Sequence, residues 1–115
     1  MTVSRVGGVA LLVLGLGWPA LQPAQAEDLP TFRIELKDGV VTPQRLEVPA
    51  NTRFKLEIAN TGTKPAEFES VQLRKEKVLA PGASSFMVIR DLDPGEYDFF
   101  DDFNPTAPRA VLVAK

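Results

Sequence analysis

Two glutamates in the middle of the chain have the residue type and spacing for metal chemistry. Glu67 and Glu69 stand in the run Glu-Phe-Glu-Ser, and on a strand both would project to one side while Phe68 points to the other. Carboxylates held this close repel each other and raise a pKa unless a cation or a donor compensates. A metal ion is one such cation, and the basic segment 74–77 offers others. A solvated acidic face is the remaining alternative.

A second acidic pair, Asp101 and Asp102, follows two phenylalanines at the end of a predicted strand. Alternation places Asp101 on the same face as Tyr97 and Phe99, directed toward the interior. A buried ionised carboxylate is costly unless it is paired or coordinated. We therefore expect Asp101 to have a partner or a metal, unless the strand ends at Phe100 and leaves both aspartates in solvent.

The chain has no cysteine and no histidine. This excludes a thiolate nucleophile, a histidine general base, zinc sites built on cysteine or histidine, and haem attached through cysteine. It also excludes a blue-copper centre, which needs a thiolate ligand, whereas oxygen ligands suit hard cations such as ferric iron, calcium or manganese. The net charge of −2 argues against nucleic-acid binding. We predict neither a haem nor a nucleotide cofactor.

The N-terminal residues have the pattern of a secretory signal peptide. A short basic start is followed by an apolar run at 6–18 and by the small-residue motif Ala-Gln-Ala at 24–26. A membrane anchor is the alternative, but the run has only about thirteen apolar residues and a spanning helix needs ~20. We predict a cleaved signal peptide at 1–26 and one domain at 27–115, exported to the periplasm.

The rest of the chain alternates apolar and polar residues with the period of a β-strand. Turn-forming residues separate the segments, and no stretch has the length and period of an amphipathic helix. The predicted strands cover 31–37, 44–49, 53–59, 66–73 with a possible continuation through 74–79, 85–92, 95–101 and 109–114. About seven short strands at this spacing predict an all-β Greek-key sandwich.

The pattern also predicts how the sandwich is closed. The inward positions of three strands should form one core: Phe32, Ile34, Leu36, Phe54, Leu56, Ile58, Tyr97 and Phe99. The spacing of Pro94, Gly95 and Tyr97 favours a tyrosine corner, in which the tyrosine hydroxyl binds a backbone group upstream. Pro43 and Pro49 flank one strand, which favours an edge position because proline cannot donate to a ladder.

The order of the last segments resembles the C-terminal half of a cupredoxin. In that family a strand of the form Gly-x-Tyr-x-Tyr/Phe-Tyr/Phe-Cys leads into a short ligand loop and a final strand rich in valine and leucine. Here the strand is Gly-Glu-Tyr-Asp-Phe-Phe-Asp at 95–101, the loop carries two prolines, and the last strand is 109–114. Asp101 stands at the position of the copper-binding cysteine, Asn104 lies roughly where a histidine is expected, and no methionine follows. The resemblance therefore implies the fold without the blue-copper ligands.

Several motifs are similar to the EfeO-type cupredoxin-like domain in particular. These are Glu-Phe-Glu-Ser at 67–70, the basic segment 73–77, Pro-Gly at 81–82 and Pro-Gly-Glu-Tyr-x-Phe-Phe-Asp-x-Phe-x-Pro at 94–105. Proteins of that family are exported and associated with high-affinity iron permeases of bacteria. The resemblance implies a periplasmic metal-binding accessory of such a permease system, without turnover chemistry of its own. Its iron, or copper without blue-copper ligands, would be held by Glu67, Glu69 and Asp101, with Asp102 as a secondary ligand.

Two alternatives stay open. The protein could be a metal-free interaction module that docks the permease or another periplasmic component through Phe100, Phe103 and the acidic loop. Phe100 alternates away from Phe99, and Phe103 follows the acidic pair. The two are expected either to form an exposed patch suited to protein docking or simply to pack on the second face of the sheet. It could also be a ferroxidase subunit that holds copper through carboxylates alone.

Overall fold

The computed structural model describes residues 28–115, so the predicted signal peptide lies outside the described residues. The strands are β1 (Thr31–Lys37), β2 (Val40–Thr42), β3 (Arg45–Val48), β4 (Phe54–Asn60), β5 (Ala66–Ser70), β6 (Lys75–Leu79), β7 (Ser84–Ile89), β8 (Gly95–Asp101) and β9 (Ala110–Ala114). Within the same residues, no helix has the length and apolar character needed to cross a membrane.

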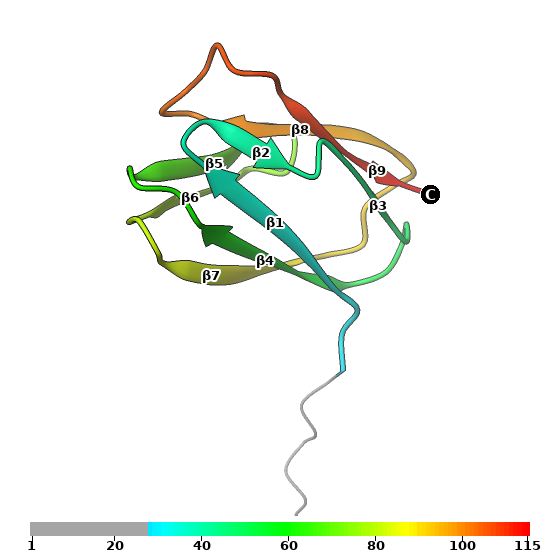
Figure 1. The fold of residues 1–115 in the computed structure, drawn as a ribbon. Helices are drawn as coiled ribbons and strands as arrows, with labels where there is room; N and C mark the ends of the chain where they lie inside the picture. Colours follow the sequence, from blue (N-terminus) through cyan, green and yellow to red (C-terminus); the bar gives the residue numbers. More distant parts are fainter. Residues whose placement is uncertain (1–27) are drawn as a thin grey trace, which may run out of the picture.

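The strands form two sheets packed face to face (Figure 1). One sheet has the order β2-β1-β4-β7 and the other has the order β3-β9-β8-β5-β6. Two of the pairings are parallel, β1 with β4 and β3 with β9, and the others are antiparallel. The all-β sandwich predicted from the alternation is therefore confirmed, although the strands number nine rather than about seven.

The core lies between the sheets, where the inward residues of the alternating strands meet. The predicted members Ile34, Leu36, Phe54, Leu56, Ile58 and Phe99 are fully buried, and Phe32 and Tyr97 pack against them as partly buried neighbours. Phe68 is buried as well, and its ring centroid lies 5.6 Å from that of Phe99. Burial of each large apolar side chain contributes about 1.5–3 kcal/mol, so this layer is the main source of stability.

Two details of strand placement agree with the sequence. The Tyr97 hydroxyl donates a hydrogen bond of 2.7 Å to the carbonyl oxygen of Asp93, which confirms the tyrosine corner. The strand between Pro43 and Pro49 is β3, which lies at one edge of the five-stranded sheet. Strand β2 was not predicted, because it has only three residues and so little alternation to recognise.

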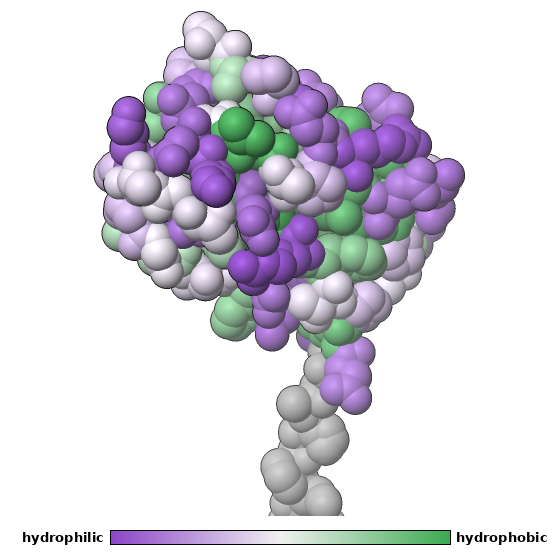
Figure 2. Space-filling model, viewed as in Figure 1, coloured by the Kyte–Doolittle hydropathy of each residue, from purple (hydrophilic) through white to green (hydrophobic). Residues whose placement is uncertain are grey.

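The outside of the sandwich is largely hydrophilic. Figure 2 shows polar residues over most of one face, with apolar residues in small separate patches. The large apolar side chains that stay exposed are Val40, Val71, Val78, Phe86 and Phe103. They come from different strands and loops, as expected when the alternating pattern sends nearly all apolar side chains inward.

Candidate metal-binding site

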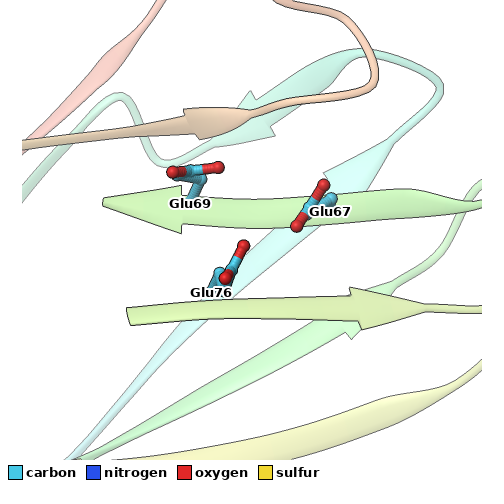
Figure 3. A group of neighbouring side chains, drawn as sticks. All are labelled: Glu67, Glu69 and Glu76. Atoms are coloured by element: carbon cyan, nitrogen blue, oxygen red, sulfur yellow. The ribbon is translucent and has the colours of Figure 1, made fainter. Parts of the chain in front are cut away.

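Three glutamates gather on the outer face of the five-stranded sheet. Glu67 and Glu69 come from β5 and Glu76 from β6, and one carboxylate oxygen of each lies within 4.8 Å of those of the others (Figure 3). The antiparallel register places Glu69 directly opposite Glu76. Along β5 the neighbours Ala66 and Phe68 are buried, so alternation leaves the glutamates half-exposed on the outside.

The cluster formed by Glu67, Glu69 and Glu76, here called the glutamate cluster, is electrostatically strained. Burial raises the pKa of Glu67, and the hydrogen-bonding and charge of Glu76 raise this pKa further. Burial also raises the pKa of Glu69, followed by the charges of Asp102 and Glu76. Like charges placed directly opposite each other on a sheet are destabilising. The cluster is therefore a place where a cation would relieve repulsion.

The basic segment next to the glutamate cluster does not neutralise it. Within residues 28–115, the ion pairs involve Glu35, Glu47 and Glu57 and none of the three clustered glutamates. The register explains this arrangement, because Lys75 and Lys77 lie opposite Ser70 and Phe68 and so project from the other face of the sheet. The basic segment, one of the two sources of positive charge considered from the sequence, therefore forms no ion pair with the clustered glutamates within the described residues.

Asp102 lies at the rim of this cluster. Its backbone N–H donates a hydrogen bond of 2.8 Å to the carbonyl oxygen of Glu67. Its charge contributes to the raised pKa values of Glu67 and Glu69, and its side chain is exposed. The structure therefore brings Asp102 together with both predicted glutamates and makes it a fourth acidic group on this face.

Asp101 has a different environment. It pairs with Phe68 across the sheet, so its side chain projects to the inner face and is only 2% exposed. This confirms the inward orientation expected from the alternation. It also means that Asp101 and the glutamates project from opposite faces. The structure brings the backbones of β5 and β8 together, as predicted, but it does not bring all three predicted carboxylates into one site.

The carboxylate of Asp101 is occupied by hydrogen bonds. Its Oδ1 accepts from the backbone N–H of Glu67 at 2.9 Å and from that of Phe103 at 3.0 Å. Its Oδ2 accepts from the side-chain amide of Asn104 at 2.9 Å. Three donors offset the cost of burying the charge. Asp101 therefore works as a structural latch that ties the start of β5 to the loop after β8.

Asn104 completes this latch. Besides its side-chain bond to Asp101, its backbone N–H donates to the carbonyl oxygen of Asp101 at 2.9 Å. The Asn104 side chain also lies against Gly39, where an added Cβ would come within 3.2 Å of the Asn104 Cγ. The residue at the expected position of a ligand histidine thus closes the end of the sandwich, in contact with the turn between β1 and β2.

The two predicted docking aromatics differ in exposure. Phe100 is only 7% exposed, because the guanidinium carbon of Arg109 lies 3.8 Å from its ring centroid and covers it. The expectation that Phe100 forms part of an exposed patch is therefore wrong. Phe103 is 48% exposed, so the exposure expected of it is confirmed, while its role in docking stays a prediction.

Glu76 is the member of the site that sequence reasoning missed. It lies in the basic segment 74–77, and its role depends on the register of the β5–β6 hairpin. The turn in that hairpin includes Arg74 with a positive φ of 59°. A signal was present in the sequence, since Glu69 and Glu76 flank a short turn, but it becomes readable only when the hairpin is recognised.

Comparisons with known proteins agree with this architecture. The chain is 33% identical over 81 residues to "Uncharacterized protein RP394" of Rickettsia prowazekii (strain Madrid E), over 70% of this chain and 65% of that protein. The matched part thus spans slightly less than two thirds of the relative's length.

Solved structures share the fold at low identity. A reduced auracyanin of Roseiflexus castenholzii has a TM-score of 0.61 at 16% identity, covering 74% of this chain and 96% of that chain. Auracyanin B has a TM-score of 0.64 at 14% identity, covering 79% and 93%. A purple cupredoxin of Nitrosopumilus maritimus has a TM-score of 0.54 at 18% identity, covering 72% and 98%.

The cupredoxin fold suggests copper, and the donor set of this chain decides how well copper would fit. The position expected to supply a thiolate carries Asp101, whose oxygens are already bound by three donors. The outer-face cluster offers oxygen ligands only, which suit hard cations better than cuprous copper. A blue-copper site therefore does not fit these residues. The sequence model of the family described as "Cupredoxin-like domain" matches residues 9–114, and the chain belongs to that family.

Proposed function

We propose that this protein is an exported cupredoxin-fold accessory protein that binds a hard cation, iron first of all, on the glutamate cluster. The observation that carries the proposal is the approach of three carboxylate oxygens to within 4.8 Å of one another without an ion pair to any lysine or arginine of residues 28–115. A trivalent or divalent cation would accept one oxygen from each glutamate, and Asp102 would bind at the rim. Oxygen ligands of this kind are those that hard cations prefer.

Other features of the sequence support the proposed place of the protein in the cell. The EfeO-type motifs and the signal-peptide pattern at 1–26 support a periplasmic location beside an iron permease. Because the clustered glutamates are half-exposed or exposed, a bound ion would keep open positions facing solvent. Such a site suits an accessory that takes up iron and passes it to the permease without chemical turnover.

The proposal is tested by thermal unfolding with and without metal. A cation that binds only the folded state raises the melting temperature by mass action. We expect ferric citrate to raise it, and Glu69→Gln or Glu76→Gln to abolish the increase. Glu57→Gln makes the same charge change on the other sheet, where Glu57 pairs with exposed Arg33 at 3.9 Å, and should retain the increase. An unchanged melting curve with iron, or an equal loss in Glu57→Gln, would overturn the assignment.

Phe103 favours a second candidate function, a metal-free docking module. It is 48% exposed and directly follows the acidic pair, and exposed aromatic residues are frequent anchors of protein interfaces. The partner would be the permease or another periplasmic component of the same system. In this case Phe103→Ala should weaken binding of the purified permease to the immobilised protein, whereas Glu76→Gln should leave it unchanged. The opposite pattern would favour the metal-binding accessory.

A further inference from the structure

The two sheets have four edge strands, and three of them carry features that prevent pairing with another chain. The edges are β2 and β7 in one sheet and β3 and β6 in the other. Strand β2 has only three residues, β3 lies between two prolines and carries Arg45 and Glu47, and β6 begins with Lys-Glu-Lys. Short strands, prolines and charged side chains are the usual protection of exposed edges.

The fourth edge, β7, has none of these features. Its sequence is Ser-Ser-Phe-Met-Val-Ile, without a charge, a proline or a glycine. It pairs with β4 along one side, and no strand of residues 28–115 pairs with its other side, at the lower edge of the molecule in Figure 1. On its outer face Phe86 is 56% exposed and Val88 is half-buried. An uncharged edge of this length is a ready template for another strand.

We propose that β7 is a self-association surface at which a second copy of this chain adds its own β7 in antiparallel orientation. Two-fold symmetry makes such an interface self-complementary, and opposed residues must share a face of the sheet. The register centred on Met87 then places Phe86 opposite Val88 of the partner subunit, and the symmetry repeats this pair. A register centred on Phe86 would instead place Val88 opposite Ser84 of the partner subunit, with only one apolar pair on the outer face.

Charge favours a second copy as the occupant of this edge. On β4, Glu57 lies beside Phe86 and Lys55 lies beside Val88. In the proposed dimer each row across the joined sheet therefore runs from a glutamate through two apolar side chains to a lysine of the other copy, and no like charges are opposed. At β6, a register centred on Glu76 would oppose two glutamates, which is unfavourable.

A cavity beside β7 offers room for the incoming phenylalanine. Its volume is about 270 Å³, and its lining includes Lys55, Phe86 and Val88. The Lys55 ammonium already lies 4.6 Å from the Phe86 ring centroid. Since Phe86 of the partner subunit would lie opposite Val88, its ring would enter this space beside Lys55, where a second aromatic face gains the same cation–π attraction.

Sedimentation velocity of the full chain over a range of concentrations tests the proposal. We expect a monomer–dimer equilibrium that Phe86→Lys weakens about 10-fold, since the change removes two cross-strand pairs per dimer and a tenfold change corresponds to about 1.4 kcal/mol. The matched control is Val78→Lys, which places the same charge at an exposed valine of the β6 edge (58% exposed) and should leave the equilibrium unchanged. At concentrations low enough for the chain to be monomeric, both variants should melt like the unmodified protein, because both side chains are exposed. A chain that stays monomeric at all concentrations, or equal weakening by both variants, would overturn the proposal.

The register is tested by a single introduced cysteine, which the chain permits because it has none of its own. Met87→Cys places two thiols opposite each other at the two-fold axis, within the range of Cα separations that a disulfide spans. We expect it to form a covalent dimer under mild oxidation much faster than Val78→Cys. Equal rates would contradict the proposed register and interface. Both experiments use a chelator, so the inference is independent of metal binding by the glutamate cluster.

Discussion

Two groups of carboxylates lie on opposite faces of the five-stranded sheet, and they differ in how their charge is supported. Asp101 is 2% exposed, yet two backbone N–H groups and one amide bind its oxygens. The glutamate cluster is more accessible to water, but partial burial and then the charges of neighbouring carboxylates raise the pKa of Glu67 and Glu69. A carboxylate therefore stabilises this fold only where hydrogen-bond donors offset the cost of its burial and of nearby negative charge.

Removing the supported carboxylate should have the largest effect. Asp101→Ala leaves the backbone N–H groups of Glu67 and Phe103 without the acceptor that they now share. Each buried donor left unsatisfied costs about 1–3 kcal/mol, so we expect a loss of about 3 kcal/mol in the free energy of unfolding. Urea unfolding measures it. Asp102→Ala is the control, because that side chain is exposed; an equal loss in both variants would show that Asp101 is not the latch.

A smaller effect is expected when a substitution at Gly39 displaces the Asn104 side chain, which donates a hydrogen bond to Asp101. Gly39 has a φ of +92°, and an added Cβ would approach the Asn104 Cγ to 3.2 Å. Gly39→Ala therefore combines backbone strain with a contact that pushes Asn104 away from Asp101, and should cost about 2 kcal/mol. Gly82→Ala is the matched control, since Gly82 has a φ of +80° but open space around its Cβ position. Denaturant midpoints that are the same for the two variants would argue against the role of Asn104.

The smallest effect concerns the glutamate cluster and depends on pH. In the folded protein the pKa values of Glu67 and Glu69 lie above the ordinary value of 4.5. Between 4.5 and the raised values the folded state binds more protons than the unfolded state, so this contribution to stability is lost as pH rises. Asp38 has the opposite sign, because the backbone N–H of Thr63 lowers its pKa, and its contribution is lost as pH falls.

The double substitution Glu67→Gln with Glu69→Gln removes the raised pKa values. We expect the variant to be slightly more stable than the unmodified protein at neutral pH and to show a weaker decline between about pH 4.5 and neutrality. Urea midpoints at a series of pH values, without metal, make the measurement. A variant whose pH profile is parallel to that of the unmodified protein would mean that the cluster carries no repulsion.

The alternation of side chains made much of this molecule predictable. Strands 31–37 and 95–101 coincide with β1 and β8, and the inward orientation of Asp101 followed from the same period of two. The hydrogen bonds of Asp101 were not predictable, because two of its donors are backbone groups whose position depends on the fold rather than on residue type. Glu76 and the cover on Phe100 escaped for a similar reason. The position of Glu76 depends on the register of the β5–β6 hairpin. The burial of Phe100 depends on the guanidinium of Arg109, which lies just before β9.

The position of β9 has a consequence for when the fold can form. This strand, at Ala110–Ala114, lies between β3 and β8 in the five-stranded sheet and pairs with both. Until residues 110–114 are available, β3 has no partner and β8 has one open edge. Strands this far apart in the sequence lose chain entropy when they meet, before their pairing stabilises them, and this slows folding. A nascent chain would therefore lack the complete five-stranded sheet until residues 110–114 have been synthesised.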